Sequence, residues 1–488
     1  MNNAQLRFVN NRIFIIAVSL VCFILNAYPK ITLPTILDDN MVLQQKTNIK
    51  LWGDARPDSK IEIKPSWTDK AYSVLCHPDG KWECLIPTPE AGGPYEIHLS
   101  DGERLILKNI LIGEVWFCSG QSNMEMPMRG FDRQPVENTN NVIAKAKPST
   151  PIRMYTTDSE NGRWVRQFNK QPQTDCKGKW LNNSPENVAN ISAPAYFFAQ
   201  YIQEVLNVPV GIIVSSWGGS KVEAWMSKEA LEPFKEIDLS HLSNNNEINN
   251  PTSTPAVLYN AKIAPLTNFV IKGFLWYQGE SNRDNADLYR KLVPAFVADL
   301  RHKWNIGNFP FYFVQIAPYN YEGPDGTSSA KLQEVQLQHM KEIPNSGMVT
   351  TLDIGHPFFI HPVDKKTVGE RLAYWALGNT YNMKGFGYKP AIYKSMEISS
   401  GKIYIDFDNA QRGICPMWTQ LDGFEIAGED RIFYPAKAEI ETRTARLAVS
   451  SENVASPVAV RYAYKNYAKA SIFGIDGIPV APFRTDNW

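Results

Sequence analysis

Polar and apolar residues alternate along the first part of the chain, from about residue 30 to residue 108. The alternating runs read VLQQKTNIKLWGDA, KIEIKP, AYSVLCHPDGKWECLIP and YEIHLSDGERLILKNI, and Gly, Pro and Asp separate them. Asp79-Gly80 is a typical two-residue hairpin turn. Turns at this regular spacing predict a small β-sandwich over residues 28–108.

The pattern changes near residue 109, where continuous apolar runs begin to alternate with segments of helical period. Predicted strands are 109–119, 208–216, 271–278, 310–317 and 347–353, and predicted helices are 193–206, 284–304, 328–342 and 365–378. This alternation favours an α/β fold with a parallel sheet flanked by helices, here over residues 109–384. Residues 385–488 return to short alternating runs and predict a C-terminal β-region.

The first 27 residues differ from the rest of the chain. Arg7 and Arg12 precede the apolar run IFIIAVSLVCFIL, and no acidic residue occurs in this segment. A basic region followed by a short apolar region is typical of a signal peptide, here residues 1–27 with cleavage after Ala27. The alternative is an uncleaved anchor, but the apolar run is short for a bilayer. We therefore expect an exported protein, periplasmic or extracellular, without stable membrane insertion.

The charged residues carry no overall bias, because 50 Lys and Arg balance 50 Asp and Glu. No global field then favours nucleic acid as a partner. Cys22 lies in the predicted signal peptide, which leaves five of the six cysteines in the mature chain. Cys76 and Cys84 flank a turn and could pair in an exported protein. No spacing of Cys and His resembles a metal site, and the sequence predicts no metal and no cofactor.

Reactive and hydrogen-bonding side chains follow four of the predicted strands. The segments are GQSNM (120–124), SSWGGS (215–220), WYQGESN (276–282) and LDIGHPFFIHP (352–362). Ligands of open parallel sheets bind outside the carboxyl ends of the strands, so these segments are expected to meet. A serine, a histidine, carboxylates and glycine amides are the groups that acyl transfer requires.

The chemistry suggests a role for each of these groups. Ser122 is the candidate nucleophile, His361 the candidate base, and Asp353 the carboxylate expected to orient His361. Candidate donors to the oxyanion are the amides of Ser122 and Gly219 and the side chain of Gln278. Each residue also has a simpler interpretation, since a serine after a strand is usually a turn residue and a histidine often caps a helix.

Several motifs, in order along the chain, resemble the sialate O-acetylesterase family within the larger SGNH hydrolase group. They are GEVWFCSGQSNMEMPM, VPVGIIVSSWGGSKVEAW, LYNAKIAPL, KGFLWYQGESN and IHPVDKKTVGERLA, followed by LDGFEIAGEDRIFYPAKAEI, PVAVRYAYKN and PFRTDNW. The resemblance implies a flavodoxin-like hydrolase core with added β-domains, no metal, and removal of acetyl groups from sugar hydroxyls.

The resemblance also implies roles for individual residues. Ser122 matches the nucleophile and His361 the base, and Gly219 and Gln278 match oxyanion positions. Glu280 and Asn282 match a motif that lines the site. The neighbouring Gln121, Asn123 and Trp217 are also expected to bind substrate.

The chain departs from the family pattern at the third catalytic residue. Related hydrolases often carry an Asp two or three residues before the catalytic histidine, where this chain has Phe359 and Phe358. Relatives also tend to have an acid at the position of His356. Two hypotheses therefore stand, a triad completed by Asp353 and a Ser–His dyad.

The substrate is expected to be an acetylated carbohydrate. Sialate is first because the family bears that name, and acetylated xylan or another hemicellulose is second. The carboxylate of a sialic acid would favour a basic pocket, and Arg129, Arg283 and Lys221 lie near motif residues. A hypothesis of another class is a carbohydrate-binding protein with an inactive hydrolase core, because the many aromatic residues could stack on sugars.

Overall fold

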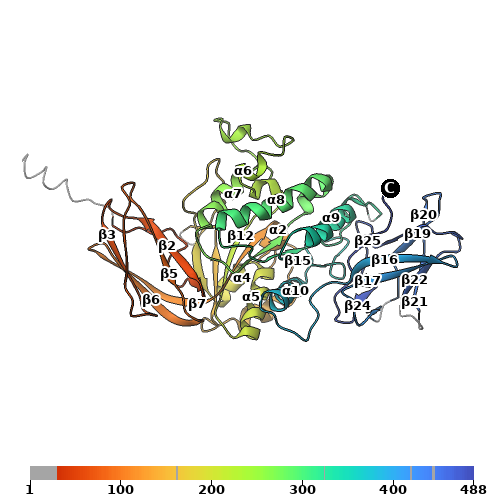
Figure 1. The fold of residues 1–488 in the computed structure, drawn as a ribbon, viewed down its shortest axis with the longest axis horizontal. Helices are drawn as coiled ribbons and strands as arrows, with labels where there is room; N and C mark the ends of the chain where they lie inside the picture. The colour runs from red at the N-terminus through yellow and green to blue at the C-terminus, as the bar shows by residue number, and fades with distance from the viewer. Residues whose placement is uncertain (1–29, 161–162, 324, 418–419, 442–445) are drawn as a thin grey trace, which may run out of the picture.

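A computed structural model describes residues 30–160, 163–323, 325–417, 420–441 and 446–488. The predicted signal peptide, residues 1–27, lies outside the described residues. Figure 1 shows an N-terminal β-region, a central α/β region and a C-terminal β-region that follow one another along the long axis of the molecule. The α/β fold class predicted from the hydrophobic pattern is confirmed. Among the described residues, no helix is both long and apolar enough to span a bilayer.

The central region is built on a mostly parallel sheet with the strand order β11-β8-β12-β7-β13-β14-β15. All neighbouring strands are parallel except β11 and β8. The strands are β7 (Arg104–Gly120), β8 (Ile152–Thr156), β11 (Lys179–Asn182), β12 (Val210–Ser216), β13 (Gly273–Tyr277), β14 (Phe311–Val314) and β15 (Ser346–Val349). The hydrophobic pattern anticipated all of these except β8 and β11.

Helices cover both faces of this sheet (Figure 1). They are α5 (Ala193–Leu206) and α10 (Lys365–Trp375) on one face, and α8 (Ala286–Trp304) and α9 (Ser328–Glu342) on the other. Trp116 of β7 is buried with α5 and α10, whereas Phe117 is buried with α8 and α9, because successive strand residues point to opposite faces. A strand apolar on both faces is expected when both faces are covered.

Helix boundaries follow local capping groups. The Ser192 hydroxyl accepts a hydrogen bond from the Ala195 amide at 3.3 Å, so α5 begins at the predicted residue. Helix α8 begins two residues later than predicted, because residues 280–285 form a 3-10 turn and the Asn285 side chain caps the helix.

The N-terminal β-region shares strand β7 with the central sheet. Strand β7 is 17 residues long and crosses the predicted boundary between residues 108 and 109. Its first half pairs with β6 (Gly92–Ser100), and β1 (Val42–Gln44) also joins it. The remaining strands are β3 (Lys60–Pro65), which pairs with β6, β4 (Tyr72–Leu75), which pairs with β3, and the separate pair β2 (Asn48–Asp54) and β5 (Lys81–Pro87). Cys76 and Cys84 are both free thiols, so the suggested disulfide is absent.

The C-terminal region consists of antiparallel sheets, as its alternating pattern predicts. Its strands are β16 (Ile392–Ser399), β17 (Lys402–Asp408), β18 (Ile414–Cys415), β19 (Phe424–Ala427), β20 (Phe433–Pro435), β21 (Lys437–Ile440), β22 (Leu447–Ser450), β23 (Ala459–Tyr462), β24 (Phe473–Gly474) and β25 (Phe483–Arg484). The side-chain oxygen Oδ1 of Asn466 accepts hydrogen bonds from the amide and the hydroxyl of Ser329, each at 3.0 Å. This contact joins the C-terminal region to the start of α9.

Shorter elements lie in the connections. They are α2 (Ser122–Glu125), α3 (Thr139–Lys145), α4 (Pro185–Asn190), α6 (Lys228–Leu231), α7 (Val257–Lys262), β9 (Ser159–Glu160) and β10 (Arg163–Trp164).

Candidate active site

Strands β12, β7 and β13 end side by side at the point where the order of strand addition reverses. After β7 the chain adds β8 and β12 on one side, and then β13, β14 and β15 on the other. Ser216 at the end of β12 and Tyr277 at the end of β13 are both in register with Gly120 at the end of β7. The switch point of a parallel sheet is where such folds bind ligands, and Ser122 follows β7 directly.

Gly120 makes this convergence possible. Its φ is +143°, and a Cβ at this position would lie 2.1 Å from the Tyr277 carbonyl oxygen. A residue with a side chain would therefore push β7 and β13 apart. The chain then turns into α2, and Ser122 is its first residue.

The turn after β12 faces the start of α2. A Cβ on Gly218 would lie 3.3 Å from the Ser122 Cβ, so this turn packs directly against the serine. Gly219 has φ +73°, and a Cβ there would meet no atom within 4 Å. Among the described residues, the backbone amides of Ser122 and Gly219 donate no hydrogen bond. Both amides are therefore available to a ligand.

The imidazole of His361 contacts two residues of the loop that follows α2. Its Nδ1 forms a hydrogen bond with Oε1 of Gln134, and the Phe131 ring packs edge-on at 5.3 Å between centroids. Its Nε2 is buried and has no hydrogen-bond partner in the described part of the chain. Burial, with a smaller contribution from the charge of Lys365, lowers the pKa of His361 to about 4. The imidazole is therefore neutral over most of the physiological range.

The structure gives Asp353 a different role from the one predicted. Both of its carboxylate oxygens accept hydrogen bonds from the Arg371 guanidinium, at 2.8 and 2.6 Å. In a bidentate pair of this kind both carboxylate oxygens bind the arginine, whereas the predicted role requires one of them to bind His361. The residue that contacts His361 Nδ1 is Gln134, and Asp353 instead anchors α10 to the end of its own strand segment.

Asn123 links the serine and histidine segments through a buried polar cluster. Its Nδ2 donates to Glu280 Oε1 at 2.6 Å and to the Ile360 carbonyl at 3.1 Å, and its Oδ1 accepts from Lys365 Nζ. Asn123 and Lys365 are fully buried. The residue after Ser122 is thus bonded to the residue before His361.

Burial shifts the pKa of both ionisable members of this cluster toward the neutral form. It raises the pKa of Glu280 and lowers that of Lys365 to about 7, although each group partly opposes the shift of the other. Glu280 Oε2 is also buried and lacks a partner in the described part of the chain.

The other polar residues predicted for the site form hydrogen bonds to neighbouring groups of the chain. Gln278 donates both amide hydrogens, to the Ser220 carbonyl at 3.1 Å and to Asn282 Oδ1 at 2.7 Å. Asn282 Nδ2 in turn donates to Glu223, and Gln121 Oε1 accepts from the amides of Gly279 and Ser281. The structure thus corrects the expectation that Gln278 donates to an oxyanion. The substrate contacts predicted for Asn123, Gln121 and Asn282 stay predictions, and in this structure each of these buried side chains forms hydrogen bonds within the protein.

Trp217 keeps an exposed surface beside the serine. Its amide donates to the Gly120 carbonyl at 3.1 Å, which fixes the backbone, while its ring lies 4.8 Å from the Arg166 guanidinium. Phe168, 41% exposed, lies next to the same ring. Trp217 and Phe168 therefore form a partly exposed aromatic surface, and the substrate contact predicted for Trp217 stays a prediction.

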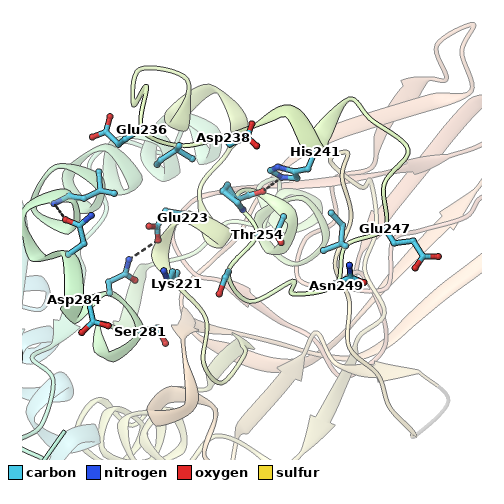
Figure 2. A pocket seen from close by; sticks show the side chains of 17 residues that line it. Lys221, Glu223, Glu236, Asp238, His241, Glu247, Asn249, Thr254, Ser281 and Asp284 are labelled. Atoms are coloured by element: carbon cyan, nitrogen blue, oxygen red, sulfur yellow. Dashed lines mark hydrogen bonds between the residues drawn. The ribbon is translucent and has the colours of Figure 1, made fainter. Parts of the chain in front are cut away.

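A cavity of about 580 Å³ adjoins these loops (Figure 2). Lys221 follows the Gly219 turn, and Ser281 follows Glu280, so the cavity begins beside the site. Its far wall comes from the segment between α6 and α7, which carries His241. Five carboxylates and one lysine line the cavity: Glu223, Glu236, Asp238, Glu247, Asp284 and Lys221. The lining is therefore predominantly acidic.

The basic residues suggested for a sugar carboxylate do not form a shared positive pocket. Lys221 lies among these carboxylates. Arg283 packs 4.3 Å from the Tyr321 ring and lies within 4 Å of Asp284 and Glu322. Over the described ranges, no group of three or more His, Cys, Asp or Glu residues could hold a metal ion.

The sequence analysis missed Gln134, Phe131 and Lys365. Lys365 lies in the quoted motif IHPVDKKTVGERLA, where a lysine in the first turn of a helix gives no sign of burial. Gln134 and Phe131 lie in a loop without hydrophobic periodicity. No local pattern marks them, because their partner is more than 200 residues away in the chain.

Comparisons with known proteins show which family the chain resembles. A family model described as carbohydrate esterase, sialic acid-specific acetylesterase, matches residues 112–377. The chain is 26% identical to the sialate O-acetylesterase of Mus musculus, over 92% of this chain and 93% of that protein. It is 27% identical to the Homo sapiens protein of the same name, over 88% and 87%. A solved carbohydrate acetylesterase from Xanthomonas citri has a TM-score of 0.84 and 33% identity, and covers 94% of this chain and 100% of its own.

The fold and these relatives define a hydrolase of carboxylic ester bonds. More narrowly, the chain belongs to the sialic acid-specific acetylesterase family of carbohydrate esterases, whose model covers more than half of it.

Proposed function

We propose that the protein removes O-acetyl groups from sugars, with acetylated sialic acid as the first candidate substrate, through Ser122 and His361. The observation that carries the proposal is the bond from Asn123 Nδ2 to the Ile360 carbonyl, which ties the serine segment to the histidine segment. The unpartnered Nε2 of His361 supports it, because a general base needs a free lone pair.

The reaction begins when Ser122 Oγ attacks the acetyl carbonyl carbon and passes its proton to His361 Nε2. The amides of Ser122 and Gly219 stabilise the oxyanion. The sugar oxygen then leaves with the proton from Nε2, and Ser122 carries the acetyl group. Water attacks the acetyl-serine and gives a proton to Nε2. Acetate leaves, and Ser122 Oγ recovers the proton.

A second candidate substrate is a neutral acetylated glycan such as acetylated xylan. The acidic lining of the cavity favours it, since carboxylates accept hydrogen bonds from sugar hydroxyls but repel a sugar carboxylate. The family model and the curated relatives favour sialate. An inactive carbohydrate-binding protein is not favoured, because the chain belongs to a family of esterases.

Acetate release from 9-O-acetyl sialic acid and from acetylated xylo-oligosaccharides tests both candidates. Ser122→Ala should reduce kcat by roughly 10⁵-fold or more while the circular dichroism spectrum is retained. His361→Ala should have a loss of similar size. Near-normal turnover by folded Ser122→Ala would contradict the mechanism, and release from neither substrate would contradict the proposed activity.

Export is a separate part of the proposal. A basic region before an apolar run supports a signal peptide over residues 1–27. Mass spectrometry of the protein recovered outside the cytoplasm should find a mature chain that begins at Tyr28. Full-length protein confined to the cytoplasm would contradict export.

A further inference from the structure

Gln134 occupies the position that a carboxylate takes in a Ser–His–Asp triad. It lies on a turn in which the amides of Phe131 and Gln134 donate to each other's carbonyl groups, at 2.9 and 3.0 Å. The turn presents Gln134 Oε1 to Nδ1 of His361 and the Phe131 ring to the imidazole edge. Two contacts from one turn therefore fix both the position and the orientation of the imidazole.

No carboxylate contacts His361 in the described part of the chain. Asp353 is bonded through both oxygens to Arg371, and Glu280 Oε1 is bonded to Asn123. Asp364 caps α10 by accepting from the amide and hydroxyl of Thr367. These three acids thus have other partners, and the acceptor for His361 Nδ1 is the amide oxygen of Gln134.

We propose that Gln134 is the positioning residue for His361: its Oε1 accepts a hydrogen bond from Nδ1–H and thereby leaves the Nε2 lone pair free for the Ser122 proton. This inference rests on the proposed function, because it assigns a partner to the base of that reaction. An amide oxygen fixes the tautomer as a carboxylate does, since both accept from Nδ1–H. It differs in carrying no charge to stabilise the imidazolium.

A neutral partner has a consequence for the pH dependence of the reaction. The charged group that acts on His361 is Lys365 of α10, with Glu280 beyond it, while Phe131 and Gln134 contribute no charge. Burial and Lys365 both disfavour the imidazolium and bring the pKa of His361 to about 4. The base is active when neutral, so kcat/KM should fall only as the pH approaches about 4. A carboxylate at position 134 would stabilise the imidazolium and move this fall to higher pH.

The test compares Gln134→Ala and Gln134→Glu in the chain that begins at Tyr28. Gln134→Ala should lower kcat about 100-fold with little change in KM, because the base loses its orientation. Gln134→Glu, which keeps the side-chain shape, should retain activity near pH 8 and move the acidic limb of kcat/KM upward by at least about one pH unit. Asp132→Ala, an exposed change on the same turn, controls for disturbance of the loop and should match wild type.

A residue that only supports the loop would change the melting temperature without moving the acidic limb. The inference is overturned if Gln134→Glu has the wild-type pH profile, or if folded Gln134→Ala keeps wild-type kcat. Should Gln134→Ala fail to fold, the Gln134→Glu profile still decides. Nitrogen NMR of the histidine side chains gives an independent readout: an Nδ1–H tautomer of His361 is expected, and a dominant Nε2–H tautomer overturns the inference. Ser122→Ala separates the two proposals, because its activity bears on the proposed function alone.

Discussion

The two sides of the candidate active site are built differently. The inner side, defined by Gln121, Asn123, Gln278, Glu280, Asn282 and Lys365, is buried and internally hydrogen-bonded. The outer side, defined by Trp217, Gly219 and the acidic cavity, is exposed and leaves aromatic, amide and carboxylate groups open to solvent. The family motifs supply the inner side and the near wall of the cavity, whereas its far wall comes from the segment between α6 and α7, outside them.

This difference separates two uses of polar residues. Buried amides pair with one another because a buried polar group without a partner destabilises the fold. Exposed groups carry no such requirement and remain available to a ligand. We therefore expect the inner side to fix the geometry of Ser122 and His361, and the outer side to distinguish substrates. Four experiments test how far the molecule depends on its buried and its exposed polar groups.

Asn123→Ala should have the largest effect on stability. It removes the partner of both Glu280 and Lys365 and leaves two buried charges without their shared amide. Breaking such a buried arrangement costs about 3–5 kcal/mol in the free energy of unfolding. Urea denaturation measures the loss, and Asn141→Ala on the exposed face of α3 is the matched control. A loss below about 1 kcal/mol would show that the inner side does not depend on this amide.

Acid should destabilise the molecule through its buried histidines. Burial lowers the pKa of His339, on the buried face of α9, to about 4. Between pH 6.5 and 4 the unfolded chain then binds a proton that the folded chain does not, so stability falls as the pH falls through this window. His339 alone accounts for roughly 3 kcal/mol of the decrease.

His339→Gln should therefore reduce the pH dependence of unfolding between pH 6.5 and 4 by a comparable amount. Urea titrations at several pH values measure it. His302→Gln, at an exposed position on α8, controls for the loss of an imidazole. An unchanged pH dependence in His339→Gln would contradict the assignment.

Asp353→Asn should affect stability more than catalysis. It weakens the bidentate pair with Arg371, which is partly buried, and we expect a loss of about 1–3 kcal/mol in the free energy of unfolding. The kcat on an acetylated sugar should stay within about threefold of wild type, because Asp353 does not contact His361. A decrease of about a thousandfold or more in a folded variant would restore Asp353 to the catalytic triad.

Charge changes in the cavity should have the smallest effect, confined to KM. Glu236→Gln combined with Glu247→Gln removes two carboxylates from the outer side. KM for 9-O-acetyl sialic acid should fall about two- to fourfold, because two unit charges about 8 Å apart in water interact by roughly 0.5 kcal/mol.

The same variant should show no comparable decrease in KM for a neutral acetylated xylo-oligosaccharide. Glu429→Gln with Glu452→Gln, in the C-terminal β-region, is the matched control for net charge. Equal KM changes for the anionic and the neutral substrate would show that binding in the cavity does not depend on the charge of the substrate.

Local sequence patterns were enough to predict the α/β fold class, five strands of the central sheet, the limits of α5 and α9, and the convergence of Ser122 with the other strand ends. These features depend on local periodicity, helix caps and the rule that parallel strands end together. Strands β8 and β11 escaped prediction because they lie in a stretch with many polar residues and turns, where pairing of β8 with β12 and of β11 with β8 decides the conformation.

The hydrogen-bond partner of each polar side chain, by contrast, depends on how the whole chain folds. Asp353 was the reasonable choice from its place in the chain, yet Arg371 on α10 takes both of its oxygens. The partner of His361 comes from a loop 227 residues earlier. Hydrogen bonds require contact within about 3 Å and a suitable angle, and sequence separation does not specify either quantity. For that reason the chemistry of this site could be read from residue types, while its orientation could be read only from the folded chain.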